Sequence, residues 1–369
     1  MKHSRVSLAI GAAVTVGLAL TSCASNEASA GSGGSSSSSS GSGASLSGTL
    51  NGVGSSAQAN AQDAWRQAFQ GKNSGVTINY DPQGSGAGRT AFLNGGAQFA
   101  GSDSALKDEE LSGTFKVCKA GTKGIDLPVY VSPIAIVYNV EGLDSLNLDA
   151  ETLAKIFSGK ITTWNDPAIA ALNKGAKLPS ANIDPVYRSD KSGTTNNFTD
   201  YLHQVAPSVW TEEANDVFPY KTGEGALKGS GVVSAVKGGK NTIGYVDKSA
   251  AKDLSIAKIK VGSDFVEPTE EGASKIAESS PVASGRETND IVVQINRKTT
   301  DASEYPLTLV SNLIACQTYA DAKAGSLVKA YAQYVASDKG QQAAAKAAGS
   351  APLSGELASK VTAAAGSIK

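Results

Sequence analysis

Histidine, methionine and cysteine are scarce in this chain of 369 residues. It has two histidines, one methionine and three cysteines, and one of the histidines, His3, stands near the N-terminus. Histidine-based catalytic triads and clusters of histidine and cysteine metal ligands therefore have few residues from which to form. The sequence predicts no catalytic site, no metal site and no cofactor.

Long apolar runs are equally scarce, and the one that occurs is Val6–Leu20, behind a short basic start. It is too short to span a bilayer comfortably and has the layout of a secretory signal, which we predict over residues 1–22. The run ends in Leu20-Thr21-Ser22-Cys23. This pattern resembles the bacterial lipobox, whose cysteine is diacylated, so we predict a lipid anchor at Cys23. The alternative is an ordinary signal peptide with an incidental cysteine.

The residues after Cys23 are poor in everything except small side chains. Residues 31–43 are only glycine and serine, and such a segment buries no core and behaves as a flexible coil. We therefore predict a linker over residues 23–46. Removing residues 1–22 removes two basic residues and no acidic one, which changes the formal net charge from −1 to −3. A negative chain argues against nucleic acid as a partner.

The remaining body, about 320 residues, is longer than one hydrophobic core usually holds, so we expect two lobes. Strand-like and helical segments alternate along it, which predicts α/β lobes with largely parallel sheets. Cys118 and Cys316 are an even pair in an exported chain, which favours a disulfide over two free thiols. The predicted strands are 76–80, 127–140, 183–187, 242–246, 291–295 and 307–315, and the predicted helices are 57–69, 150–157, 194–205, 231–236, 326–335, 341–348 and 355–365.

Two loops near the start of the body suit an anion, because ligands of such sheets bind where strand ends meet helix N-termini. The first loop, residues 51–56, precedes an amphipathic helix, and we place Ser56 at the N-cap of that helix. The second loop, residues 84–89, is rich in glycine, which lets the backbone approach a ligand. A helix is expected to begin near Gly88. The loop lacks the spacing of a nucleotide-binding P-loop.

Two further loops carry charged residues. The third loop, residues 99–104, contains Asp103, which on the sequence alone favours a helix cap. The fourth loop, residues 188–195, places Arg188 at a strand end, just before Ser192-Gly193-Thr194 at the start of a helix. Arginine can pair with two oxygens while backbone N–H and hydroxyl groups supply further donors, so this loop indicates an oxyanion site. Asp190 is placed to hold the guanidinium.

In these four loops the chain resembles the phosphate-specific solute-binding protein (PstS family) of the Pst ABC importer, in particular its Gram-positive, actinobacterial lipoproteins. The resemblance covers nearly the whole body and includes the motifs at residues 152–166, 243–246, 305–307 and 351–353. It implies a two-lobed periplasmic-binding-protein fold of type II, with a hinge and a ligand cleft between the lobes. Lobe I is expected over residues 47–132 plus 306–369 and lobe II over 133–305, with chain crossings near 131–133 and 305–307.

The resemblance also implies the ligand contacts. The phosphate-binding residues carried over from the family are Ser56, Ala57 through its N–H, Ser85, Asp103, Arg188, Ser192, Gly193 and Thr194, with Asp190 supporting Arg188. Many relatives have Thr-Phe where this chain has Ser56-Ala57, so the wall of the pocket differs here. An ionised Asp103 can only accept hydrogen bonds. It therefore favours phosphate, which has a proton to donate, over sulfate, which has none.

The function implied is that of a monomeric binding protein, not an enzyme, held by Cys23 on the extracytoplasmic face of the cell membrane. It would capture inorganic phosphate and deliver it to the transmembrane permease subunits of an ABC importer. The alternatives are a binding protein for another oxyanion such as sulfate or molybdate, a phosphate-ester hydrolase, and a surface adhesin. A hydrolase needs an activated nucleophile, and His203 stands too far along its helix to pair readily with Ser192.

Overall fold

The computed structural model describes residues 45–369. The predicted signal peptide at 1–22, the predicted lipid anchor at Cys23 and all but the last two residues of the predicted linker lie outside the described residues, so they stay predictions. Among residues 45–369, no helix combines the length and the apolar character that crossing a membrane requires.

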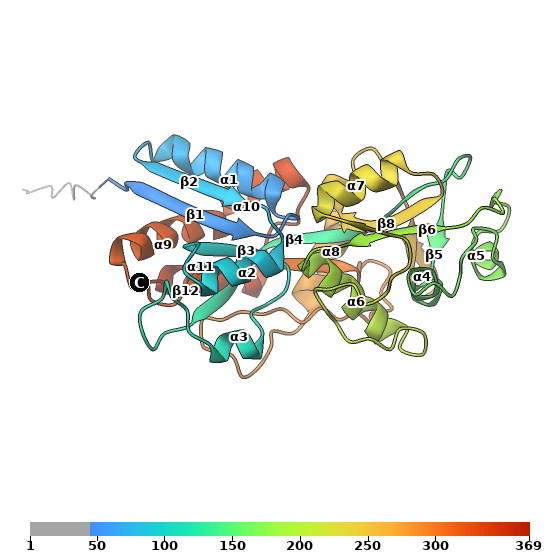
Figure 1. The fold of residues 1–369 in the computed structure, drawn as a ribbon. Coiled ribbons are helices and arrows are strands. Elements are labelled where there is room, and N and C mark those ends of the chain that lie inside the picture. The colour runs from blue at the N-terminus through green and yellow to red at the C-terminus, as the bar shows by residue number, and fades with distance from the viewer. Residues whose placement is uncertain (1–44) are drawn as a thin grey trace, which may run out of the picture. The chain divides into compact units, whose positions relative to one another are not determined.

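One long strand connects the two halves of the body. β4 (Gly124–Asn139) pairs antiparallel first with β12 (Thr308–Cys316) and then with β8 (Thr242–Asp247). The change of partner falls between Pro133 and Ile134, and Figure 1 shows β4 passing from one half of the body to the other. Fifteen of its sixteen residues are buried, as expected of a strand that is covered on both faces.

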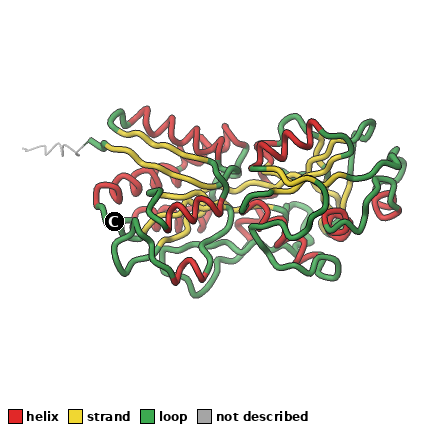
Figure 2. The backbone as a smooth tube through the Cα atoms, viewed as in Figure 1, coloured by secondary structure: helices red, strands yellow, loops and turns green. Residues whose placement is uncertain are grey.

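The half of the sheet on one side of this crossing has the order β2-β1-β3-β12, and we call it, with its helices, lobe I. β1 is parallel to both β2 and β3. Helices lie on both sides of these strands (Figures 1 and 2). The elements are β1 (Gly48–Gly54), β2 (Val76–Asp81), β3 (Phe99–Ser102), α1 (Ala59–Lys72), α2 (Ser85–Leu93), α3 (Asp108–Ser112), α9 (Ala322–Ala336), α10 (Asp338–Ala348) and α11 (Gly355–Ser367).

The other half has the order β8-β6-β7, with β6 parallel to both neighbours, and we call it, with its helices, lobe II. α7 packs on β6 and β8, and α4 packs on α6. A small separate sheet has the order β11-β10-β5. The elements are β5 (Asn147–Leu148), α4 (Ala150–Phe157), α5 (Pro167–Leu172), β6 (Asp184–Arg188), α6 (Gly193–Val205), β7 (Glu224–Ala226), α7 (Lys228–Gly238), the 3₁₀ turn η1 (Lys248–Ala250), β9 (Ser255–Ile256), β10 (Lys258–Val261) and β11 (Asp264–Val266).

The two-lobed α/β fold is confirmed, but two expectations about strands are wrong. The central pairings, which β4 and β12 make with each other and with β3 and β8, are antiparallel, because β4 leaves lobe I and β12 re-enters it. Residues 291–295 form no strand: Ile291 and Ile295 are buried, and the segment has only one isolated bridge, Val282 to Val293. Its apolar run arises from packing against lobe I, not from sheet pairing.

The predicted lobe boundaries stay a prediction, although the structure shows where the chain crosses. The backbone N–H of Ile134 donates to the carbonyl of Leu307 at 2.8 Å, so the two crossing segments lie side by side. α8 (Glu270–Ser279) and the residues after it pack on β4, β12 and α11. Residues 270–296, which the sequence assigned to lobe II, therefore contact lobe I elements along much of their length.

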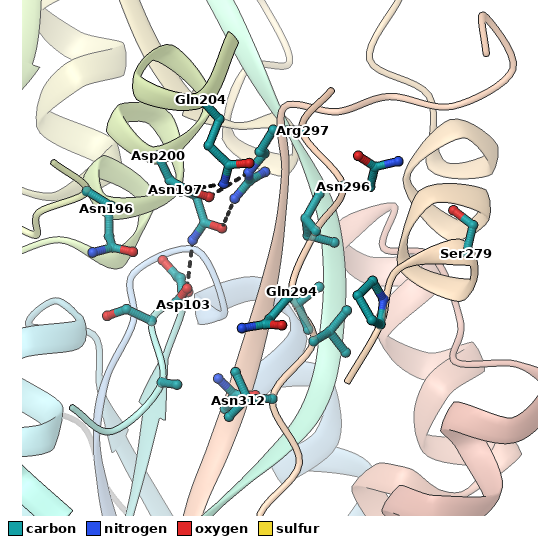
Figure 3. A pocket seen from close by; sticks show the side chains of 18 residues that line it. Asp103, Asn196, Asn197, Asp200, Gln204, Ser279, Gln294, Asn296, Arg297 and Asn312 are labelled. Atoms are coloured by element: carbon teal, nitrogen blue, oxygen red, sulfur yellow. Dashed lines mark hydrogen bonds and ion pairs between the residues drawn. The ribbon is translucent and has the colours of Figure 1, made fainter. Parts of the chain in front are cut away.

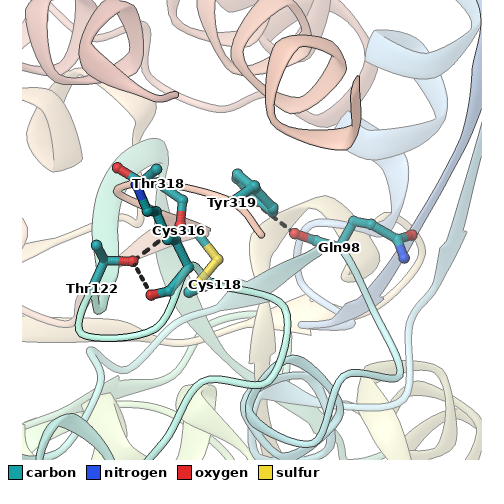
Figure 4. Close-up of a disulfide and its surroundings, with 7 residues drawn as sticks. Gln98, Cys118, Thr122, Cys316, Thr318 and Tyr319 are labelled. Carbon is teal, nitrogen blue, oxygen red and sulfur yellow. Dashed lines mark hydrogen bonds between the residues drawn. A yellow bond between two sulfur atoms is a disulfide. The ribbon is translucent and has the colours of Figure 1, made fainter. Parts of the chain in front are cut away.

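The predicted disulfide between Cys118 and Cys316 is confirmed (Figure 4). It joins the loop before β4 to the last residue of β12, two positions 198 residues apart in the sequence. Hydrogen bonds hold the same loop: Lys119 N–H donates to the carbonyl of Thr318 at 2.8 Å, and the Thr122 hydroxyl donates to that carbonyl at 3.0 Å. The bond therefore ties the crossing strands together at their far ends in lobe I.

Replacing both cysteines by serine should lower the free energy of unfolding by about 2–5 kcal/mol, because a cross-link over so long a loop restricts the unfolded chain. Urea unfolding of the wild type and the double variant, each with and without reductant, measures the change. Reductant should destabilise the wild type and leave the variant unaffected. Superimposable curves for the oxidised wild type and the variant would contradict the expectation.

Candidate functional site

The four predicted loops meet in the structure. Residues 51–54 of the first loop are the end of β1, the second loop follows β2, and residues 99–102 of the third loop are β3 itself. These strands are parallel neighbours or next neighbours, so their carboxyl ends share one edge of lobe I. The fourth loop follows β6 in lobe II and lies against that edge, where the Gly86 N–H donates to the carbonyl of Lys191 at 3.0 Å. The site is thus built from strand ends and helix N-termini of both lobes.

Asp103 lies at the centre of this meeting point and is 4% exposed. Its Oδ1 accepts hydrogen bonds from the hydroxyls of Ser55 and Ser311, and its Oδ2 accepts one from Thr194 at 3.0 Å. An ionised carboxylate has about four acceptor positions, so one position on Oδ2 remains beside Thr194. The expectation of a helix cap is wrong for Asp103, since α3 begins at Asp108 with Lys107 before it.

The first loop differs in detail from the prediction. α1 begins at Ala59 with Gln58 at the N-cap, so Ser56 is not the cap. The chain makes an extra turn here because the Ala57 N–H donates to Ser55 Oγ at 3.0 Å. Ser56 Oγ instead accepts a hydrogen bond from the Gly229 N–H of lobe II at 3.2 Å. The Ala57 N–H is therefore engaged within its own loop in this structure.

Glycines allow the second and fourth loops to approach each other. α2 begins at Ser85, not near Gly88, and Gly84 before it has a φ of +101°. A Cβ at Gly84 would stand 2.5 Å from Asp190 Oδ2, and one at Gly193 would stand 2.7 Å from Ser85 Oγ. Side chains at either position would hold the two lobes apart. Ser85 Oγ meanwhile accepts a hydrogen bond from the Asp103 N–H at 3.1 Å.

The fourth loop holds Arg188 in a fixed direction. Its Nε donates to Asp190 Oδ1 at 2.7 Å and its Nη2 donates to Asp190 Oδ2. Asp190 Oδ1 also accepts from the Lys228 N–H at 3.0 Å. Burial raises the pKa of Asp190, but the hydrogen bonds and charge of Arg188 outweigh it and bring that pKa below its usual value. Within residues 45–369 the second terminal nitrogen of Arg188, Nη1, makes no hydrogen bond.

The helix after this loop, α6, begins at Gly193, one residue before the predicted start. Ser192 is the N-cap of α6, and its Oγ accepts from the Thr195 N–H at 3.2 Å. The Tyr245 hydroxyl lies 2.7 Å from Thr195 Oγ1 and accepts a hydrogen bond from the Arg188 N–H at 3.2 Å. The strand end and the helix start are thus tied together, with the N–H groups of the first turn of α6 directed at the meeting point.

A cavity of about 470 Å³ lies beside these groups. Four of the predicted residues border it, Ser56, Ala57, Arg188 and Thr194, together with Lys228 and Asp247. The remaining predicted residues do not border this cavity but lie next to those that do: Asp103 binds Thr194, Ser192 and Gly193 directly precede Thr194, and Ser85 lies against Gly193. The structure therefore brings all of the predicted residues into one neighbourhood.

Asp103 instead borders a second cavity, of about 640 Å³, whose polar lining is mostly amides (Figure 3). Asn197 stands between the two lobes there, since its Nδ2 donates to the Asp103 carbonyl at 2.7 Å and its Oδ1 accepts from Arg297 at 2.7 Å. Arg297 in turn donates to the carbonyls of Pro306 and Thr308 at 2.8 and 2.6 Å. A chain of hydrogen bonds thus runs from Asp103 to the crossing segment.

Sequence reasoning missed Ser55, Ser311, Asn197 and Arg297. A bulge in β12 between Ser311 and Asn312 accompanies the contact of Ser311 with Asp103. A serine inside an otherwise apolar strand was the available signal for Ser311. Arg297 had no such signal, because nothing in its own segment shows that it is buried. No three histidine, cysteine or carboxylate side chains in the described part of the chain stand close enough together to hold a metal ion.

Comparison with known proteins identifies relatives of this chain. Residues 38–339 match the family model of the PBP superfamily domain. The Phosphate-binding protein PstS 3 of Mycobacterium leprae is 38% identical over 347 residues, which are 90% of this chain and 91% of that protein. The Phosphate-binding protein PstS 2 of Mycobacterium tuberculosis is 38% identical over 326 residues, 86% of this chain and 87% of that protein.

Two solved structures are similar in fold to this chain. The high-affinity periplasmic phosphate-binding protein PfluDING, bound with phosphate at pH 8.5, has a TM-score of 0.69 and 26% identity, over 86% of this chain and 93% of that one. A phosphate binding protein from Stenotrophomonas maltophilia has a TM-score of 0.67 at 21% identity, over 86% and 94% of the two chains, which shows the shared fold.

Asp247, at the edge of the first cavity, should make the stability depend on pH. Burial raises its pKa to about 6, the charge of Asp103 adds to the rise, and hydrogen bonds from Ser249 and Ser132 oppose it. The folded protein therefore holds this proton more tightly than the unfolded chain, whose pKa is about 3.9. The resulting stability is present below about pH 4 and is lost as the pH rises through 6, by about 3 kcal/mol in all.

Urea unfolding at about pH 4, 6 and 8 tests this expectation. Relative to Asp247→Asn, the wild type should lose stability as the pH rises. Asp264→Asn, which changes an exposed carboxylate on β11, should follow the wild type. Parallel pH profiles for the wild type and Asp247→Asn would show that the carboxyl has no such role.

Proposed function

We propose that this chain, which belongs to the PBP superfamily and to its family of PstS phosphate-binding proteins, binds inorganic phosphate outside the cell membrane and delivers it to an ABC importer. The relatives are named as phosphate-binding proteins, and one structure with the same fold holds phosphate. The permease subunits of the importer are the partner that such a delivery requires.

The observation that carries the proposal is the carboxylate of Asp103. Three hydroxyls already donate to it, which leaves one acceptor position, on Oδ2 beside Thr194. Both ionic forms of phosphate that occur near neutral pH carry a proton that can fill this position. Sulfate carries none, so it would oppose an acceptor to an acceptor in a buried site. Asp103 therefore selects phosphate over a fully deprotonated oxyanion.

The donors around this acceptor suit the remaining phosphate oxygens. Arg188 keeps Nη1 unengaged within the described residues and has its charge balanced by Asp190. The proposed contacts beside Arg188 and Asp103 are the hydroxyls of Ser56, Ser85 and Ser192 and the N–H groups of Gly193 and Thr194 at the start of α6. The Ala57 N–H joins them once it leaves Ser55. Most donors are neutral, so recognition depends on the number and direction of hydrogen bonds.

A monomer anchored through Cys23 fits the transport role. A diacylated cysteine holds a protein on a membrane surface stably, and a flexible linker lets the two-lobed body move between solution and a permease. Capture at the site requires both lobes, since Asp103 and Arg188 come from different ones, so the lobes close over the anion. The closed form then offers the permease a surface that the open form lacks.

A hydrolase is the less favoured candidate. His203 lies eleven residues beyond Ser192 on α6, which is about 16 Å at the rise of a helix. The hydroxyls of Ser55 and Ser311 donate to a carboxylate and have no histidine to take up their proton. Activation of a serine nucleophile, as an esterase requires, is therefore not provided.

Titration calorimetry of the ligand-free protein with phosphate and with sulfate tests the function. Phosphate should bind and sulfate should bind at least about a hundredfold more weakly. In Asp103→Asn the amide can turn its N–H₂ toward a deprotonated oxygen, so the preference for phosphate should shrink by about tenfold or more.

Asp108→Asn, on α3 of the same lobe and exposed, is the matched control and should keep the preference. Unchanged selectivity in Asp103→Asn would remove the role of that residue. Absence of phosphate binding by the wild type, or turnover of a chromogenic phosphate ester, would overturn the proposed function itself.

A further inference from the structure

A buried ion pair joins the two lobes outside the proposed phosphate contacts. Asp216 lies in the loop after α6, and its side chain is 3% exposed, as is that of Arg89 on α2. Arg89 Nη2 donates to Asp216 Oδ2 at 2.6 Å, and the Ser104 hydroxyl donates to Asp216 Oδ1 at 2.9 Å. Lys107 adds a second cation, with Nζ 3.2 Å from Oδ2. A lobe II carboxylate is therefore surrounded by lobe I donors.

Lobe I holds these donors in place by itself. Arg89 Nε donates to both carboxylate oxygens of Glu110 at 3.0 Å, and its Nη1 donates to the hydroxyls of Ser102 and Ser104 at 3.0 and 2.7 Å. Arg89 and Lys107 carry two positive charges against one negative charge on Glu110. The carboxylate of Asp216 neutralises the remaining positive charge when lobe II contacts lobe I. Burial raises the pKa of Asp216, but the charge of Arg89 outweighs it and lowers that pKa below its usual value.

The same pair touches three of the four loops of the site. Arg89 is on the helix that begins with Ser85, and Ser104 is the residue after Asp103. The backbone carbonyl of Asp216 accepts the N–H of Ser192, the N-cap of α6, at 2.9 Å. A displacement of Asp216 therefore moves the start of α6 relative to Ser85 and Asp103.

We propose that Asp216 and Arg89 are positioning residues for anion binding: their ion pair forms as the lobes come together and holds the Ser192 loop against the Ser85 and Asp103 loops. Neither residue contacts the ligand. The inference rests on the proposed function, because it assigns to this pair a share of the affinity for phosphate. Its consequence is kinetic: the pair retains bound phosphate, whereas first encounter with the open site does not need it.

Stopped-flow measurement of phosphate association and dissociation with Asp216→Asn tests the proposal. Asparagine preserves the shape and the backbone carbonyl but removes the charge that Arg89 binds. The dissociation rate constant should rise by about 10–100-fold, and the association rate constant should change by less than about threefold. Selectivity for phosphate over sulfate should stay at the wild-type ratio, because Asp103 is untouched.

Two further variants sharpen the test. Lys107→Ala, at a partly exposed side chain, should raise the dissociation rate by about 2–5-fold. The double variant Arg89→Gln with Asp216→Asn should dissociate phosphate at a rate close to that of the faster single variant, because both changes remove the same Arg89–Asp216 ion pair. These variants keep the proposal testable if any one of them folds poorly.

Asp126→Asn is the matched control, because Asp126 is a buried carboxylate paired with Arg286 at 2.8 Å among elements that pack on lobe I. It should alter thermal stability and leave phosphate dissociation unchanged. Wild-type dissociation rates in Asp216→Asn, with phosphate still bound, would overturn the positioning role and leave the proposed function standing. A wild type that does not bind phosphate would instead overturn the proposed function.

Discussion

The rest of the structure depends on β4, because this one strand belongs to both lobes. Its hydrogen-bond partner changes from β12 to β8 between Pro133 and Ile134, so both ends are held in sheets and only the junction is free to bend. The return crossing is held to the same place: Tyr305 donates its hydroxyl to the carbonyl of Ile134 at 2.9 Å, and Arg297 binds the carbonyl of Thr308. The two crossing segments are thus bonded to each other at the junction, which fixes how the loops at the edges of the two lobes face each other.

Those contacts form a site in which the central charged groups already have hydrogen-bond partners. Asp103 accepts from three neutral hydroxyls, and Arg188 is paired with Asp190. A protein of net negative charge can therefore hold an anion without a strongly positive pocket, provided that enough neutral donors face it. Buried polar groups of this kind discriminate sharply, because a ligand that fails to match one of them leaves it unpaired. In the proposed function, Asp103 is the group that a fully deprotonated anion fails to match.

Much of this could be predicted from local sequence pattern. α4 forms over the predicted residues, and α6 begins one residue before its prediction, because amphipathic spacing and an N-cap serine are local signals. The predictions fail where residues distant in the sequence determine the local structure. A local pattern places Ser56 at the cap, but Ser55 makes the turn with Ala57 and donates to Asp103, which stands 48 residues beyond Ser55. The apolar pattern of residues 291–295 resembles that of a strand, because burial against lobe I requires the same apolar side chains as a sheet. Ser311 and Arg297 act through contacts that no local window contains.

The interlobe contacts also explain how affinity can be divided in such a protein. Some of them, such as Arg89 with Asp216 and Gly86 with Lys191, do not involve the anion and favour closure whether or not it is present. Others, at Asp103, Thr194 and Arg188, involve the groups of both lobes that we propose as ligand contacts. A ligand shifts the equilibrium toward closure only by the contacts that it makes in the closed form and lacks in the open one. The contacts that do not involve the anion must therefore be too weak to close the empty cleft by themselves, because otherwise the ligand could not shift the equilibrium.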